Sequence, residues 1–127
     1  MLDEAIIKRY VHLDTDISNF QDHGEGLYQF DARVNGRPEL GPVGVLLATN
    51  VNPTMVLLLA QIDASGKGLS AALTATSKVG VVGVAQLENS YFLRYGVFRE
   101  YVEPLALTNG IQALALAYSI YAQEISF

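Results

Sequence analysis

The chain has 127 residues, half of them hydrophobic and 17% charged, and its net charge is −5. This length suits a single domain spanning residues 1–127, and the apolar content argues against an intrinsically disordered chain. The absence of cysteine excludes disulfide scaffolds and thiol chemistry, and the lack of a lysine or arginine cluster argues against nucleic acid as a partner.

The first segment fits both a helix and a strand. Apolar residues recur at three- and four-residue spacing over residues 2–20, which is typical of one helix stripe. Apolar and polar residues also alternate from Ile7 to Ser18, as they do in a strand. Asp3 and Glu4 favour a helix start through the helix dipole, although His12 to Asp16 contains poor helix formers. We therefore predict a helix over residues 3–20.

A β-meander is expected next. Apolar residues from Leu27 to Val34 lead into Asn35-Gly36, a strong hairpin signal, and the prolines of residues 38–42 predict a bend. Two nearly continuous apolar runs, Val43 to Val51 and Thr54 to Ile62, then predict strands. Such runs are typical of strands covered on both faces, so we expect helices on one face and allow for a second subunit on the other.

The second half of the chain predicts a helix, a hairpin and a long helix. Helical spacing covers residues 69–79, and Gly80 to Leu87 and Tyr91 to Val102 form the hairpin. Asn109 and Gln112 have the spacing of a capping box at the start of the last helix. The apolar seam of this helix is Leu107, Ile111, Leu114, Tyr118, Tyr121 and Ile125. The predicted order is α-β-β-β-α-β-β-α, an α+β fold with helices packed on an antiparallel sheet.

Membrane and export signals are not expected. Prolines and asparagines interrupt the uncharged residues 40–62, and polar residues interrupt the uncharged residues 104–123, so we predict no membrane span. The sequence begins with acids rather than with cations before an apolar run, unlike a secretory signal. Together with the lack of cysteine, this favours a cytoplasmic location.

Acidic residues and both histidines gather in the first quarter. Residues 1–31 account for the whole net charge, because the six acids and six bases of residues 32–127 cancel. Oxygen side chains from Asp14 to Glu25 follow much of the spacing of an EF-hand calcium loop, but Asn19 and Gln21 replace its glycine and its hydrophobic residue. Candidate ligands for calcium, for a transition metal or for acid–base chemistry are His12, Asp14, Asp16, Asp22, His23 and Glu25.

A solvated acidic surface is the favoured interpretation of these residues. We therefore predict no catalytic residue, no bound metal and no cofactor. Gly66-Lys67-Gly68 lacks the remaining residues of a phosphate-binding loop, so it does not change that expectation.

The order of elements is similar to that of a known family. The matching features are the opening helix, the meander with Asn35-Gly36, the helix over 69–79, the hairpin with Tyr91-Phe-Leu-Arg-Tyr95, and Leu107-Thr-Asn-Gly before the long helix. In these features the chain resembles the small acidic type III secretion chaperones of the CesT kind and the related YbjN-like proteins. The resemblance spans almost the whole chain and concerns architecture rather than a motif, so no functional residue is transferred.

The resemblance implies a function. Such chaperones are homodimers that offer an apolar sheet face and groove to an extended partner segment, without ATP. We therefore predict a non-enzymatic protein-binding module whose partner is another protein or a second copy. The alternatives are a small-molecule or divalent-metal-binding protein that uses the N-terminal segment, and a structural subunit of a larger assembly. The last helix differs from the family in having Glu124 as its only charge, so we expect it to be more buried.

Overall fold

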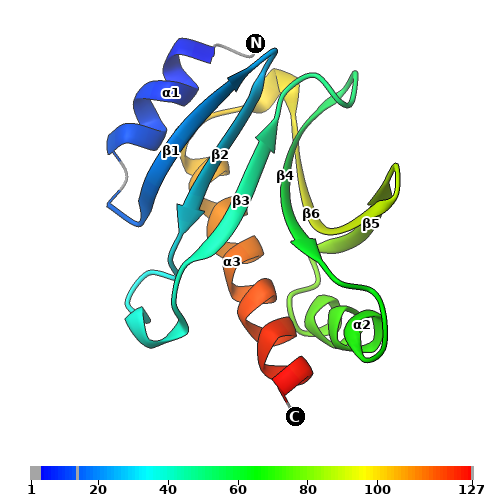
Figure 1. Ribbon diagram of the computed structural model, residues 1–127. Helices are drawn as coiled ribbons and strands as arrows, with labels where there is room; N and C mark the ends of the chain where they lie inside the picture. Colours follow the sequence, from blue (N-terminus) through cyan, green and yellow to red (C-terminus); the bar gives the residue numbers. More distant parts are fainter. Residues whose placement is uncertain (1–3, 14, 127) are drawn as a thin grey trace.

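The chain folds into one antiparallel sheet and three α-helices in a computed structural model that describes residues 4–13 and 15–126 (Figure 1). The sheet has six strands in the order β1-β2-β3-β4-β6-β5, which confirms the predicted α+β class. In chain order the elements are α1 (Glu4–Leu13), β1 (Ile17–Gly24), β2 (Leu27–Ala32), the 3-10 helix η1 (Pro38–Leu40), β3 (Val43–Ala48), β4 (Met55–Ile62), α2 (Gly68–Lys78), β5 (Gly83–Leu87), β6 (Ser90–Phe98), the 3-10 helix η2 (Arg99–Tyr101) and α3 (Pro104–Ser126).

The predicted helix over residues 3–20 is wrong beyond Leu13. The helix ends there, and an additional strand, β1, begins at Ile17 and pairs with β2. The segment thus contains both a helix and a strand, although the alternation from Ile7 to Ser18 overlaps β1 only at its last two residues. The poor helix formers after His12 favour an early end to the helix, and pairing with β2 then supplies backbone hydrogen bonds to the residues that follow.

Three contacts fasten α1 to the rest of the fold. Ile7 is buried in the main core. The Lys8 ammonium lies 2.9 Å from the carboxylate of Asp22 and 5.8 Å from the centre of the Tyr28 ring. The hydroxyl of Tyr10 is hydrogen-bonded to that of Thr108 in α3. The helix is thus held on the same side of the sheet as α3.

The Asn35-Gly36 signal marks a turn but no tight hairpin. The Arg37 amide donates to the carbonyl of Val34 over 3.1 Å, and Gly36 has the positive φ of 74° that such a turn favours. However, η1 follows, and β3 begins only at Val43. The proline-rich bend therefore lengthens the connection between β2 and β3.

Three predicted strands are shorter than expected. β5 begins at Gly83 instead of Gly80, β3 ends at Ala48 instead of Val51, and β6 ends at Phe98 instead of Val102. Beyond these ends, the Arg99 guanidinium donates to the carbonyls of Thr49 and Asn52, the latter at 3.4 Å. This side chain joins η2 to the turn between β3 and β4.

The predicted capping box at Asn109 and Gln112 is wrong, because α3 already begins at Pro104. Proline suits a first helical position, where no amide donor is needed. Gln112 instead bonds outside the helix. Its side-chain oxygen accepts from the Asn35 amide at 2.8 Å, and its side-chain nitrogen donates to the Arg33 carbonyl at 2.9 Å. It thereby ties α3 to the connection after β2.

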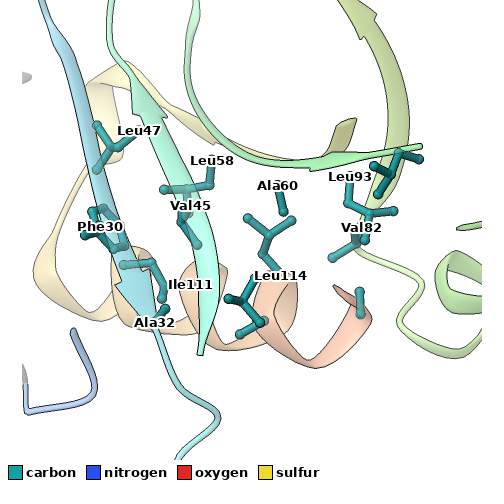
Figure 2. Packing of buried hydrophobic residues seen from close by; sticks show 14 of the residues in the cluster. Phe30, Ala32, Val45, Leu47, Leu58, Ala60, Val82, Leu93, Ile111 and Leu114 are labelled. Carbon is teal, nitrogen blue, oxygen red and sulfur yellow. The ribbon is translucent and has the colours of Figure 1, made fainter. Parts of the chain in front are cut away.

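The main core lies between the sheet and α3 (Figure 2). The predicted seam of α3 is largely confirmed, since Leu107, Ile111, Leu114 and Tyr121 are all buried, while Ile125 is exposed. The close approach of helix and sheet depends on Gly110. A Cβ atom at this position would lie 2.7 Å from ring atoms of Tyr95 and 2.8 Å from Leu58.

By length and composition, α3 is apolar enough to cross a membrane. In this fold it packs on the sheet, chiefly against β4 and β6, and 44% of its most apolar window is buried inside the domain. Its apolar character therefore also has a role in the core.

Candidate functional site

The two faces of the sheet differ in what covers them. Val56, Leu58 and Ala60 of β4 belong to the main core, which also contains residues of α1, α2 and α3. The alternate residues of the same strand point to the opposite side and belong to a second apolar cluster. Its members, all from strands among the described residues, are Leu27, Leu46, Ala48, Met55, Leu57, Leu59, Leu87 and Phe92. We call this side the open face.

Strand register assembles this cluster. Leu46 of β3 lies opposite Leu59 of β4, and Ala48 lies opposite Leu57. On the other side of β4, Met55 lies opposite Phe98 of β6. The open face of β3 and β4 is therefore apolar, and it extends onto β6 at Phe92 and Phe98, with Arg94 and Gly96 between them.

The centre of this surface is sheltered and its edge is not. Leu57 and Leu59 are each 3% exposed, and partly buried side chains of the same cluster pack against them. Leu46 and Met55 are half-buried, and Phe98 is 57% exposed. The exposed apolar area of this face therefore lies at its edge, on Leu46, Met55 and Phe98.

The same face is polar at β1 and β2. Gln29 and Asp31 alternate with the buried Tyr28 and Phe30. The side-chain nitrogen of Asn19 donates to Asp31 over 2.7 Å, and the His23 ring nitrogen Nε2 lies 2.8 Å from the side-chain oxygen of Gln29. This half of the open face is typical of a sheet surface in contact with water.

Arg94 of β6 is the only charged residue in β3, β4, β5 and β6, and it lies on the open face. Its Cα neighbours across the sheet are Leu59 and Gly83. A guanidinium nitrogen of Arg94 lies 3.3 Å from the sulfur of Met55, and it would lie 3.4 Å from a Cβ atom at Gly96. The arginine thus extends along its strand over a glycine, within the apolar surface.

The N-terminal metal candidates are not gathered into a site. Asp22 pairs with Lys8, whose hydrogen bond, together with the Gly24 amide, lowers the pKa of this carboxyl below its usual value. His23 bonds to Gln29, and Asp16 and Glu25 lie beyond opposite ends of β1. The side chain of His12 and the whole of Asp14 lie outside the described residues.

The spacing that suggested a calcium loop lies largely on a strand, because residues 17–24 form β1. Among the side chains that the structure describes, which exclude those of His12 and Asp14, no three from histidine, aspartate or glutamate are close enough to hold a metal ion. The strand holds the backbone extended, whereas an EF-hand ligand loop must wrap around its ion.

A polar depression of about 530 Å³ lies where β4 ends, beside the turn of the β5–β6 hairpin. Asp63 is its acidic group. The hydroxyl of Ser65 donates to this carboxylate over 2.6 Å and the Ser65 amide donates over 2.9 Å, and both bonds lower the pKa of Asp63. The carboxylate is therefore engaged within its own loop.

A second apolar surface lies on the outer side of α2. Ala71, Ala72 and Ala75 face the core, whereas Leu69 is 45% exposed and Leu73 is 55% exposed. The two leucines are four residues apart and so are neighbours on the helix surface. No charged residue lies between them in the sequence.

The open face was only partly foreseen. The apolar runs of β3 and β4 predicted cover on both faces, but the importance of Arg94 depends on register with β4 and β5, which the sequence does not display. Comparison of the chain with models of protein families, with curated proteins and with solved structures found no match.

Proposed function

We propose that this chain is a non-enzymatic protein-binding module whose open face holds an extended apolar segment of a partner protein. The observation behind the proposal is the second apolar cluster, which the helices of the domain leave uncovered. Apolar area removed from water contributes roughly 25 cal/mol per Å², so the affinity would come from the edge of this cluster, where Leu46 and Met55 are half-buried and Phe98 is exposed. The proposal agrees with the function that the family resemblance implies.

The edge of the sheet suits an extended partner. β5 is the last strand, paired only with β6 within the described sheet. Its open-face residues include Gly83 and Ala85, which have small or absent side chains. A segment added beside β5 could make main-chain hydrogen bonds and reach the apolar surface with alternate side chains.

Charge decides between the two possible occupants of the open face. β3, β4, β5 and β6 contain Arg94 but no acidic residue. If a second copy covered the apolar half of the face with its own, a second cation would enter the same interface. We therefore assign this surface to a different protein.

We also propose that a second copy of the chain binds at the outer side of α2. The surface around Leu69 and Leu73 includes Ser70 and Ser77 and has no charge at its centre. A two-fold contact brings identical surfaces together, so a neutral apolar surface can pair with itself without repulsion. Light scattering tests this: the Leu69→Ser/Leu73→Ser variant should be half the mass of the parent, whereas Ile125→Ser should leave the mass unchanged. A parent chain that stays monomeric at rising concentration would contradict the dimer.

The partner-binding proposal is tested with the full chain and a displayed library of random twelve-residue peptides. We expect enrichment of peptides that contain several apolar residues, and amide shifts on binding should concentrate in β4, β5 and β6. Phe98→Asp should weaken the enriched peptides about ten-fold or more, because it places a charge on an exposed apolar contact.

Ile125→Asp is the matched control, since it changes an exposed apolar residue at the far end of α3. It should leave binding unchanged. Failure to enrich any peptide, or enriched peptides that shift amides only outside the open face, would contradict the proposal.

A further inference from the structure

Arg94 differs from other arginines of the fold in what its guanidinium contacts. Arg99 donates to the carbonyl oxygens of Thr49 and Asn52, and Arg37 is paired with the carboxylate of Glu39. For Arg94 the contact is the thioether sulfur of Met55. A thioether is a weak acceptor, whereas a guanidinium has five N–H donors.

No ion pair of Arg94 is found among the side chains that the structure describes. The pairs of Lys8 with Asp22 and of Arg37 with Glu39 involve other cations. Both lie away from the apolar half of the open face. The guanidinium of Arg94 stays charged at every working pH and thus presents its N–H donors from a surface that is otherwise hydrophobic.

The backbone leaves room for a ligand above this arginine. Its neighbour on β5 is Gly83, where a Cβ atom would meet nothing within 4 Å. Gly96, two residues along β6, leaves the space over which the arginine side chain lies. A larger residue at Gly96 would crowd the guanidinium, whereas the space at Gly83 is open.

We infer that Arg94 binds a carboxylate of the partner, so that the segment held on the open face is apolar and contains an aspartate or glutamate. The inference rests on the proposed function. A carboxylate matches the planar guanidinium with two parallel hydrogen bonds, and these bonds strengthen where the surrounding surface excludes water. The apolar surface supplies affinity, while the arginine selects the segment and fixes its register.

A phosphorylated segment is a different possibility that the charges disfavour. Phosphate sites usually combine several cations, and Arg94 is the single cation of these four strands. The site therefore matches the single negative charge of a carboxylate.

The test uses the enriched twelve-residue peptides. Substitutions are made first in the peptides and only afterwards in the protein. Each peptide with a glutamate or aspartate is compared with its glutamine or asparagine counterpart on the unmodified full chain, by fluorescence anisotropy. We expect the neutral peptides to bind about ten-fold more weakly or worse, since a hydrogen-bonded charge pair is lost. This arm requires no folded variant.

The protein is then changed by Arg94→Met, with Arg37→Met as the control that removes a positive charge elsewhere. On Arg94→Met the acidic and neutral peptides should bind within two-fold of each other, while Arg37→Met should keep the ten-fold preference. Arg94→Glu should in turn favour peptides with lysine in place of the acid.

The outcomes separate the two proposals. Enriched apolar peptides that map to the open face but have no acid, or whose acid can be neutralised without loss on the unmodified chain, would overturn the role of Arg94 and leave the binding surface standing. Failure to enrich any peptide would overturn both. A preference for acid that persists in Arg94→Met at full strength would also overturn the inference.

Discussion

The two faces of β4 are built from equally apolar residues, yet only one of them is covered by helices. Leu58 packs beneath α3 in the main core, whereas Leu57 belongs to the cluster on the open face. In β2 the two faces differ as expected for a half-wet sheet, with Phe30 buried and Gln29 exposed. The polar residues on the open face of β2 are suited to contact with water. The apolar residues on the open face of β4 are not, so their position requires another explanation. A partner that covers them is the one we propose.

The largest expected effect comes from shortening a leucine beneath α3. Leu58→Ala should lower the free energy of unfolding by about 2–5 kcal/mol, because it removes transfer energy and leaves a cavity in a closed core. Leu57→Ala should cost less, since Leu57 belongs to the smaller second cluster, in which Leu46 and Met55 are only half-buried. Urea denaturation of both variants measures the difference. Equal losses would show that the second cluster is packed as tightly as the main core.

A methyl group added on each face of the sheet tests the same comparison a second time. Gly110→Ala should lower the free energy of unfolding by about 1–3 kcal/mol, because the new carbon meets Tyr95 and Leu58. Gly83→Ala, on the open face, should change it by less than about 1 kcal/mol, because the added carbon meets open space. Thermal denaturation followed by circular dichroism checks both. A neutral Gly110→Ala would contradict the close approach of α3.

A smaller effect should follow the loss of the Gln112 side chain. Gln112→Ala removes two hydrogen bonds that tie α3 to the connection after β2, and should cost about 1–2 kcal/mol. Gln29→Ala removes an exposed contact with His23 on the open face and should cost less. Hydrogen exchange of the Asn35 amide provides a local measurement. Unchanged protection of this amide in Gln112→Ala would show that the bond is not formed.

The smallest effect should be the pH dependence contributed by Asp22. Its pKa is lowered in the folded chain, first by the hydrogen bond from Lys8 and then by the Gly24 amide. A lowered pKa stabilises the fold above the unfolded value of about 4, and this stabilisation is lost as the pH falls through the folded value. Asp22→Asn should therefore lower the melting temperature slightly at pH 6 and lose that deficit near pH 2. A deficit that stays constant over this range would contradict the ion pair.

Much of the architecture could be predicted from local pattern. The helix over residues 69–79 corresponds to α2 within one residue at each end, and the seam of α3 was found because its residues repeat with helical spacing. The prediction for the first segment is wrong because helical and strand-like spacing overlap there. Pairing with β2 decides where the helix ends and the strand begins. The predicted capping box of α3 is wrong although Asn109 and Gln112 have the right spacing, because Pro104 already provides a suitable helix start.

The candidate site was less accessible from the sequence. The apolar runs predicted strands with two apolar faces, but nothing local distinguishes the face that receives helices from the face that stays open. The N-terminal acids suggested a ligand set because they are close in sequence, whereas β1 separates Asp16 from Glu25 along an extended strand.

The sequence by itself determined the α+β class, the apolar seam of α3 and the concentration of charge in the first 31 residues, because each depends on neighbours a few positions apart. Only the tertiary structure decided that the helices share one side of the sheet and that Arg94 lies among Leu59, Gly83 and Gly96 on the other. Register and layer packing join residues far apart in the chain, and their free energy depends on contacts that local periodicity does not encode.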